Sequence, residues 1–250
     1  MSFIDVSKVS LIYPGHGIKR GRSAPLALKR DSKIGSEILQ GGKGVYALKD
    51  VSVSLKAGDR LGIVGSNGSG KSTLLQVMAG IMPPSAGEVT HEGEISALFN
   101  VGIGMKMEAS GITNIILSGL IHGLTRKEAK DRVPEIAEFS GLGDYLHMPI
   151  RTYSRGMVMR LAFATATSFE PEILLLDEWI GAGDDDFRDK AQERMNSLVG
   201  GAGIVVIASH RLPLLKEICT QFLWLQSGQV VEYGNDVEIV NRFRDRNKSN

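Results

Sequence analysis

A glycine-rich loop of nine residues constrains this chain more than any other feature. It reads Gly-Ser-Asn-Gly-Ser-Gly-Lys-Ser-Thr from Gly65 to Thr73. The apolar run Leu61–Val64 precedes it and the helix-favouring run Leu74–Met78 follows it, which is the strand, loop and helix order that the phosphate-binding pattern G-x-x-x-x-G-K-S/T requires. The loop therefore predicts a nucleotide site on an α/β sheet.

Each part of the loop has an expected contact with the phosphates of a nucleotide. Glycines let successive backbone N–H groups turn towards the phosphates, where the helix N-terminus adds its positive dipole end. Lys71 is expected to reach the terminal phosphates, and the Ser72 hydroxyl to bind Mg²⁺. The loop residues predicted to bind the nucleotide are Gly65, Ser66, Asn67, Gly68, Ser69, Gly70, Lys71, Ser72 and Thr73.

Two carboxylates follow a second apolar run, Ile173–Leu176. Parallel α/β sheets bind their ligands at the carboxyl ends of the strands, so Asp177 is predicted to hold Mg²⁺ directly or through water. Glu178 is predicted to face the γ-phosphate and polarise the attacking water. A solvated acidic turn is the alternative interpretation of this pair, and the phosphate loop upstream argues against it.

Composition excludes several classes of protein. The 250 residues are 42% hydrophobic, enough for a packed α/β core. The net charge is +1, from 29 basic and 28 acidic residues, which argues against a surface built for nucleic acid. No apolar run approaches the ~20 residues of a membrane-spanning helix, and the one cysteine, Cys219, leaves no intramolecular disulfide.

The periodicity predicts alternating strands and helices. A strand is expected over Glu88–Leu98, and a helix over Lys127–Phe139 with Thr125 as its N-cap and Glu128 completing a capping box. Apolar strands at Ile173–Leu176 and Ile204–Ala208 flank a polar helix, an arrangement typical of a parallel sheet.

Further motifs follow these elements in a definite order. The residues Tyr153-Ser-Arg-Gly-Met157 precede a helix, Gly181-Ala-Gly-Asp184 follows the acidic pair, and Ser209-His210 follows a strand. Together with the loop and the acidic pair, they resemble the ATP-binding cassette of ABC transporters over nearly the whole chain. A small-molecule kinase, the weakest alternative, would not need the Ser-Arg-Gly-Met sequence.

The resemblance implies an α/β P-loop NTPase fold of the ABC type. It has a parallel-sheet RecA-like core, an N-terminal antiparallel β subdomain and an inserted α-helical subdomain. We expect one ABC ATPase domain over residues 1–250, without a separate glycan-binding domain. Its expected parts are a nucleotide-binding core at 1–98 and 171–228 with an insertion at about 14–44, a helical subdomain at 99–170, and a tail at 229–250.

The resemblance also implies a homodimer in which two cassettes pair head to tail. In such a pair the signature of one chain closes over the γ-phosphate held by the other chain's phosphate loop; the signature residues are Ser154, Arg155, Gly156 and Met157. Asp184 would lie in the loop that crosses between the chains. His210 would contact the γ-phosphate, although a lone histidine after a strand is otherwise a solvent-facing residue.

Two further positions are assigned from the resemblance. Tyr13 stands where family members stack an aromatic ring on adenine, with Tyr46 as the competing candidate. Asn100 stands where most cassettes carry a glutamine that links the metal and the water to the helical subdomain. It is counted with Ser72 and Asp177 at the metal, although its shorter side chain offers the carbonyl from a shifted backbone.

The run Val101–Asn114 and the sequence Asp177-Glu-Trp179 are similar to polysaccharide-export cassettes. This implies an ATPase that drives export of a lipid-linked polysaccharide, O-antigen first, at the cytoplasmic face of the bacterial inner membrane, with two copies of an integral membrane permease. A teichoic acid or capsule exporter and a soluble, non-transport ABC ATPase are the alternatives. The basic insertion between Pro14 and Gly44 is either a solvated loop or a contact with anionic lipid headgroups.

Overall fold

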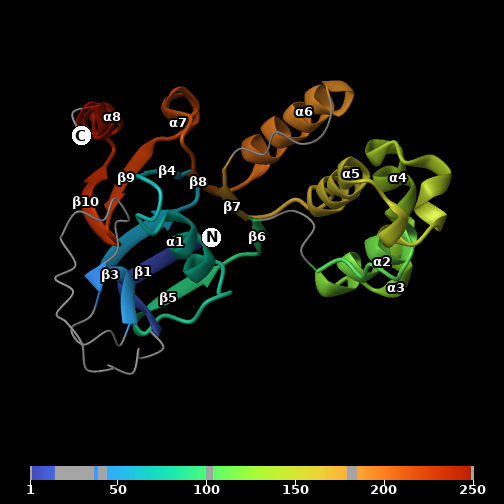
Figure 1. Cartoon of the computed structure of the whole chain (residues 1–250), viewed down its shortest axis with the longest axis horizontal. Helices are drawn as coiled ribbons and strands as arrows, with labels where there is room; N and C mark the ends of the chain where they lie inside the picture. Colours follow the sequence, from blue (N-terminus) through green and yellow to red (C-terminus); the bar gives the residue numbers. More distant parts are fainter. Residues whose placement is uncertain (1, 15–36, 39–43, 100–103, 179–184, 249–250) are drawn as a thin grey trace, which may run out of the picture. The chain divides into compact units, whose positions relative to one another are not determined.

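The computed structural model divides the chain into two compact units (Figure 1). The first contains residues 1–97, 172–179 and 203–250, and the second contains residues 98–171 and 180–202. The structure describes residues 2–14, 37–38, 44–99, 104–178 and 185–248.

An antiparallel sheet of four strands forms one part of the first unit. Its order is β2 (Glu37–Ile38), β3 (Gly44–Lys56), β1 (Phe3–Pro14) and β5 (Ala86–Glu92). Every neighbouring pair in it is antiparallel. One face of β1 and β3 is buried, because apolar residues recur at alternate positions along each strand.

A six-stranded sheet carries the core of the first unit. Its strands, in spatial order, are β10 (Gln229–Gly234), β9 (Gln221–Gln226), β4 (Arg60–Val64), β8 (Ile204–Ala208), β7 (Ile173–Asp177) and β6 (Ile95–Leu98). The pairs β9–β4, β4–β8 and β8–β7 are parallel. The three central strands are almost wholly apolar and buried, as a parallel sheet covered on both faces requires.

Three helices complete the first unit. Helix α1 (Lys71–Met78) packs on β7 and β8 and also contacts β3, α7 (Leu212–Ile218) packs on β4, and α8 (Glu238–Lys248) packs on β9. The glycine-rich loop follows β4 directly, and its last three residues, Lys71 to Thr73, form the first turn of helix α1. The sheet and α1 therefore fix the two ends of that loop.

The second unit is helical. It contains α2 (Gly111–Ile121), α3 (Arg126–Asp131), α4 (Val133–Ser140), α5 (Arg155–Ala166), α6 (Asp185–Gly201) and two short 3₁₀ helices, η1 (Gly143–His147) and η2 (Ile150–Thr152). Its core gathers Ile115 of α2, Ile136 of α4, Leu161 of α5 and residues of the 3₁₀ segments. Among the described residues, no helix combines the length and apolarity needed to cross a bilayer.

Two expected elements are each divided in the structure. The strand predicted over Glu88–Leu98 is two strands in different sheets, β5 and β6, with Gly93 at a φ of +113° between them, a conformation that favours glycine. The helix predicted over Lys127–Phe139 is α3 and α4, because Pro134 cannot donate the backbone hydrogen bond that a continuous helix needs. The predicted capping box of Thr125 and Glu128 is confirmed.

Candidate nucleotide-binding site

The glycine-rich loop is folded tightly against its surroundings. Gly68 and Gly70 have φ angles of +74° and +104°, in the region that side chains disfavour. A methyl group on Gly65 would lie 2.5 Å from the carbonyl oxygen of Leu225, and one on Gly70 would lie 2.7 Å from that of Ala47. The loop therefore needs glycine at these positions both for its turns and for its close approach to neighbouring backbone.

Lys71 points back over the loop that precedes it. Its ammonium donates to the carbonyl oxygens of Gly65 at 2.8 Å and Ser66 at 3.1 Å. Burial lowers the pKa of Lys71, and the charges of Asp177 and Glu178 act in the opposite direction. The two carboxylates at the end of β7 and this ammonium thus share one electrostatic environment, which suits binding of a charged phosphate group.

A buried hydroxyl in the same loop lacks a partner. Ser69 is 1% exposed, and its Oγ is the only fully buried side-chain oxygen or nitrogen in the described part of the chain without a hydrogen bond. Ser72 and Asn67, by contrast, are exposed. Because buried polar atoms are normally paired, the Ser69 hydroxyl is a polar group still free to accept or donate at the phosphate loop.

Glu178 is held in a strained backbone conformation. Its φ is +68°, which costs a side-chain-bearing residue about 1–2 kcal/mol. Its N–H donates to the carbonyl oxygen of Ala208 at 2.8 Å, and its Oε1 accepts from the backbone N–H of His210 at 3.2 Å. The His210 Nε2 lies 3.7 Å from the same Oε1. The structure thus brings together the two residues predicted to be catalytic.

The predicted metal ligands are only partly described. Asp177 is half-buried at the carboxyl end of β7 and Ser72 lies in the first turn of α1; Asn100 and Asp184 lie outside the described residues. Over the described ranges, no three His, Cys, Asp or Glu side chains gather as a metal site. Ser72 and Asp177 nevertheless fit Mg²⁺, which takes one or two protein oxygens and completes its shell with water and phosphate.

The signature residues begin helix α5 in the second unit. Ser154 is the N-cap, and its Oγ accepts from the N–H of Met157 at 3.2 Å. Ser154, Arg155 and Gly156 are exposed, and a methyl group on Gly156 would meet nothing closer than the Ser154 Oγ at 3.9 Å. An accessible helix N-terminus with open space above its glycine is a suitable group for capturing an anion.

The two candidate tyrosines lie on neighbouring strands. Tyr13 of β1 pairs with Val45 of β3, and its hydroxyl donates to the Sδ of Met82 at 3.4 Å. Tyr46 lies opposite Ile12, and the Lys49 ammonium lies 5.6 Å from the centroid of the Tyr46 ring. Tyr13 is 41% exposed whereas Tyr46 is half-buried. The assignment of Tyr13 as the residue that stacks on adenine stays a prediction.

Two supporting residues had no role assigned from the sequence. Ser209 is buried, and its Oγ lies 3.5 Å from Glu178 Oε2 while it accepts from the N–H of Arg211. Gly228 donates its N–H to the carbonyl oxygen of Ser69 at 2.9 Å. Gly228 stands in the turn between β9 and β10, far from the loop in sequence, so only the fold shows its contact.

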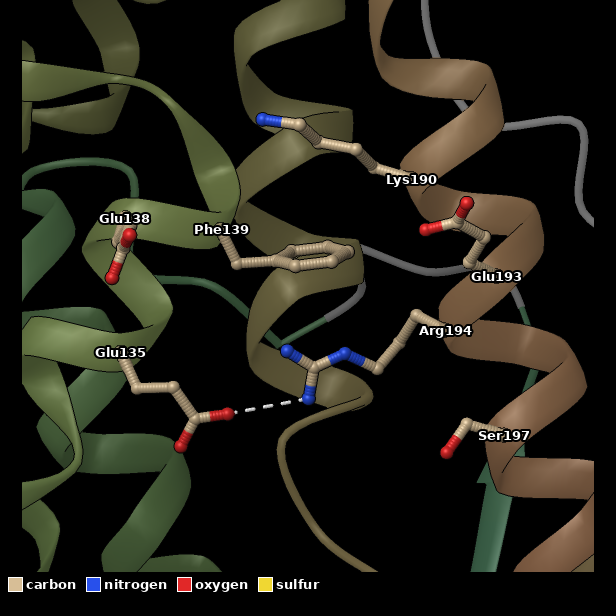
Figure 2. Close-up of a pocket in the computed structure, with 7 residues that line it drawn as sticks. All are labelled: Glu135, Glu138, Phe139, Lys190, Glu193, Arg194 and Ser197. Carbon is tan, nitrogen blue, oxygen red and sulfur yellow. Dashed lines mark hydrogen bonds and ion pairs between the residues drawn. The ribbon is translucent and has the colours of Figure 1, made fainter.

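A groove of about 490 Å³ lies between α4 and α6 of the second unit, separate from these residues. Figure 2 shows the guanidinium of Arg194 between the Phe139 ring and the Glu135 carboxylate. Arg194 lies 4.5 Å from the ring centroid and 3.2 Å from the Glu135 Oε1. These contacts fasten α6 to α4.

Known proteins that are similar to this chain include ATP-binding proteins of ABC transporters. The model of the family described as ABC transporter matches residues 48–181. The O-antigen export system ATP-binding protein RfbE of Yersinia enterocolitica is 48% identical over 77% of this chain and 81% of its own length. RfbB of Myxococcus xanthus, with the same description, is 39% identical over 80% of this chain. The teichoic acids export ATP-binding protein TagH of Bacillus anthracis is 40% identical over 79%.

The match spans only 46% of RfbB and 36% of TagH, so both relatives are longer proteins. Among solved structures, an ATP-binding subunit of an ABC transporter is similar at a TM-score of 0.68, with 22% identity over 97% of this chain and 93% of that one. A dimeric ATP-binding cassette bound to ADP and phosphate is similar at a TM-score of 0.65, with 21% identity over 93% of this chain and 98% of that one. These two likenesses concern the fold.

Proposed function

Because the chain belongs to the ABC transporter family and is an ATPase of that family, we propose that it is the motor subunit of a lipid-linked polysaccharide exporter. The proposed substrate class is O-antigen. The observation that carries this choice is the relatedness to the RfbE export protein, which extends over most of both chains. The TagH relatives favour teichoic acid as the second candidate.

The first step of the proposed cycle is phosphate binding by the loop from Gly65 to Thr73. The Lys71 ammonium exchanges its two carbonyl partners for oxygens of the terminal phosphates. Backbone N–H groups and the N-terminus of α1 stabilise the remaining negative charge. The unpartnered Ser69 hydroxyl supports this proposal, because a bound nucleotide or an ordered water would satisfy it.

Ser72 and Asp177 are the residues proposed to hold Mg²⁺, with Asn100 as a further candidate. When bound, this ion would neutralise charge on the phosphate oxygens during transfer. Glu178 is proposed to orient the attacking water and accept its proton. Its hydrogen bond from the His210 N–H and its contact with Ser209 support this role, since both hold the carboxylate in one place.

The site is proposed to be completed by a second copy of the chain. Ser154, Arg155, Gly156 and Met157 of one copy would approach the γ-phosphate bound by the other, with Asp184 in the crossing loop. The N-terminus of α5 supports this arrangement, because Ser154, Arg155 and Gly156 are exposed and the space above Gly156 is open. ATP binding would then pull two chains together and hydrolysis would release them.

Transport further requires a membrane partner. We place the chain at the cytoplasmic face of the inner membrane, against two copies of a separate permease that passes the lipid-linked glycan. Co-purification of the tagged chain with a polytopic membrane protein, and restoration of surface glycan in a strain lacking the gene, are the expected results. A chain that binds no polytopic protein and restores no glycan while hydrolysing ATP would instead support a soluble ABC ATPase.

Two substitutions test the ATPase assignment itself. Lys71→Ala should weaken ATP binding, measured by calorimetry, because it removes the charge that faces the phosphates. Glu178→Gln should bind ATP like the wild type and lose at least about 100-fold in turnover, as expected for a general base. Wild-type turnover in Glu178→Gln would contradict the role proposed for this carboxylate.

A further inference from the structure

A loop and a 3₁₀ segment of the second unit are joined immediately before the signature. The N–H of Ile150 donates to the carbonyl oxygen of Ala109 at 3.0 Å, and the N–H of Arg151 donates to that of Met107 at 2.9 Å. Ser110 and Pro149 form an isolated antiparallel bridge. The loop at 104–110 and the segment at 149–152 are therefore joined by backbone hydrogen bonds.

Asn114 holds that loop from inside. Its side chain lies on α2 and is 5% exposed. Its Oδ1 accepts from the N–H of Lys106 at 2.7 Å. Its Nδ2 donates to the carbonyl oxygens of Lys106 at 3.0 Å and Ser110 at 2.9 Å, with a longer contact to Ala109 at 3.4 Å. One buried amide thus fixes both ends of a five-residue turn.

The segment joined to this loop leads directly into the signature. Helix η2 ends at Thr152, Tyr153 is buried, and Ser154 caps α5. The Tyr153 hydroxyl donates to the carbonyl oxygen of Tyr145 at 2.5 Å. Gly111, the first residue of α2, approaches so closely that a methyl group there would lie 2.6 Å from that hydroxyl. No flexible linker separates the loop held by Asn114 from Ser154.

We propose that Asn114 is a positioning residue that sets the place of Ser154 for capture of ATP bound by a second copy of the chain. The inference rests on the proposed function, because it concerns the same composite site. A displacement of the loop would pass through two backbone hydrogen bonds to residues 150–151 and then to the N-cap of α5. Displacements of about 1 Å at a reacting group reduce rates by up to about 100-fold.

Asn114→Asp tests this inference with little change in volume. The carboxylate keeps the acceptor for the Lys106 N–H but loses both donors, and it faces the carbonyl oxygens of Lys106 and Ser110 instead. The phosphate loop belongs to the other unit, so ATP affinity of the single chain should stay within about twofold. In the Glu178→Gln background, ATP-driven dimerisation should weaken by about tenfold or more. When Asn114→Asp is the only substitution, ATP turnover should fall at low chain concentration. It should recover as the chain concentration rises, because more chains then pair.

Ser140→Ala is the matched control. Ser140 is fully buried in the same unit, and its hydroxyl donates to the carbonyl oxygen of Ala137 within its own helix α4. The Ser140→Ala variant should therefore dimerise like its parent. Should Asn114→Asp fail to fold, Asn114→Ser replaces it, because serine can still bond to the Ser110 carbonyl of the preceding turn while releasing Lys106.

The outcomes separate the inference from the proposed function. A Glu178→Gln parent that stays monomeric with ATP would overturn the composite site itself. A parent that dimerises, with folded Asn114 variants that dimerise equally well, would overturn only the role of Asn114. A loss of dimerisation shared equally by Ser140→Ala would also overturn it, because general weakening of the unit would then explain the effect.

Discussion

At the scale of single residues, two glycines in the candidate site are required for different reasons. Gly65 is enclosed: a methyl group there would lie 2.3 Å from the Ser69 Oγ and 2.5 Å from the Leu225 carbonyl oxygen. Gly156 has open space around it and lies in the first turn of α5. The fold explains the first glycine, whereas the second keeps open, on our proposal, the space that the phosphate of a second chain would enter.

Alanine at these two positions should therefore separate stability from activity. Gly65→Ala should lower the free energy of unfolding by about 1–3 kcal/mol, through overpacking. Gly156→Ala should leave that energy unchanged or raise it by up to about 1 kcal/mol, because alanine favours helix, and should still abolish ATP turnover. Denaturant titrations and ATPase assays of both variants check this. Full activity in Gly156→Ala would contradict the role of the signature.

Cys219 gives a prediction about pH. Burial raises the pKa of its thiol from 9.0 to about 12. Between these values the unfolded chain loses the thiol proton and the folded chain keeps it, so the folded state loses stability as pH rises from 9 towards 12. The cysteine contributes up to about 1.4 kcal/mol per pH unit there. Cys219→Ala should have a shallower decline of unfolding free energy above pH 9; parallel declines would contradict the assignment.

At the scale of elements, one local hydrogen-bond pattern could be predicted, whereas two breaks between elements and the long-range contacts could not. The capping box of Thr125 and Glu128 could be predicted because both of its hydrogen bonds lie within four residues. The breaks at Gly93 and Pro134 were missed because hydrophobic periodicity continues across them. The residues supporting the phosphate loop from other strands, such as Gly228, carry no sequence signal, because their contacts are backbone ones.

Helix α6 offers a test at this scale. Arg194 contacts the Phe139 ring and the Glu135 carboxylate of α4 (Figure 2). The side chains of Arg194 and Glu135 are partly exposed, so Arg194→Ala should cost only about 1 kcal/mol of unfolding free energy. In a double-mutant cycle, the coupling free energy between Arg194→Ala and Glu135→Ala should be a few tenths of the cost of Arg194→Ala alone. The coupling free energy between Arg194→Ala and Phe139→Leu should be larger. Strict additivity in both cycles would show that neither contact fastens α6.

At the scale of the whole molecule, the predicted fold is confirmed: an antiparallel β sheet and a largely parallel P-loop sheet accompany a helical unit, and the solved neighbours are ABC cassettes. The phosphate loop, Lys71 and Glu178 could be predicted from short local motifs, and His210 from the order of motifs that the resemblance supplies; their roles stay predictions. The half of the site carried by Ser154 and Gly156 acts, on our proposal, on another molecule. The structure of a single chain therefore shows no ligand contact for Ser154 or Gly156, and the role proposed for them rests on the sequence motif.

The central claim is that each ATP is enclosed by two chains, and mixing two inactive variants tests it most directly. Lys71→Ala inactivates the phosphate loop and Gly156→Ala inactivates the signature, so the homodimer of either variant has two defective sites. A mixed dimer would hold one intact site, formed by the loop of one chain and the signature of the other. An equal mixture should recover about a quarter of the wild-type ATPase rate per chain, because about half of randomly formed pairs are mixed. A mixture as inactive as its folded components would contradict the account.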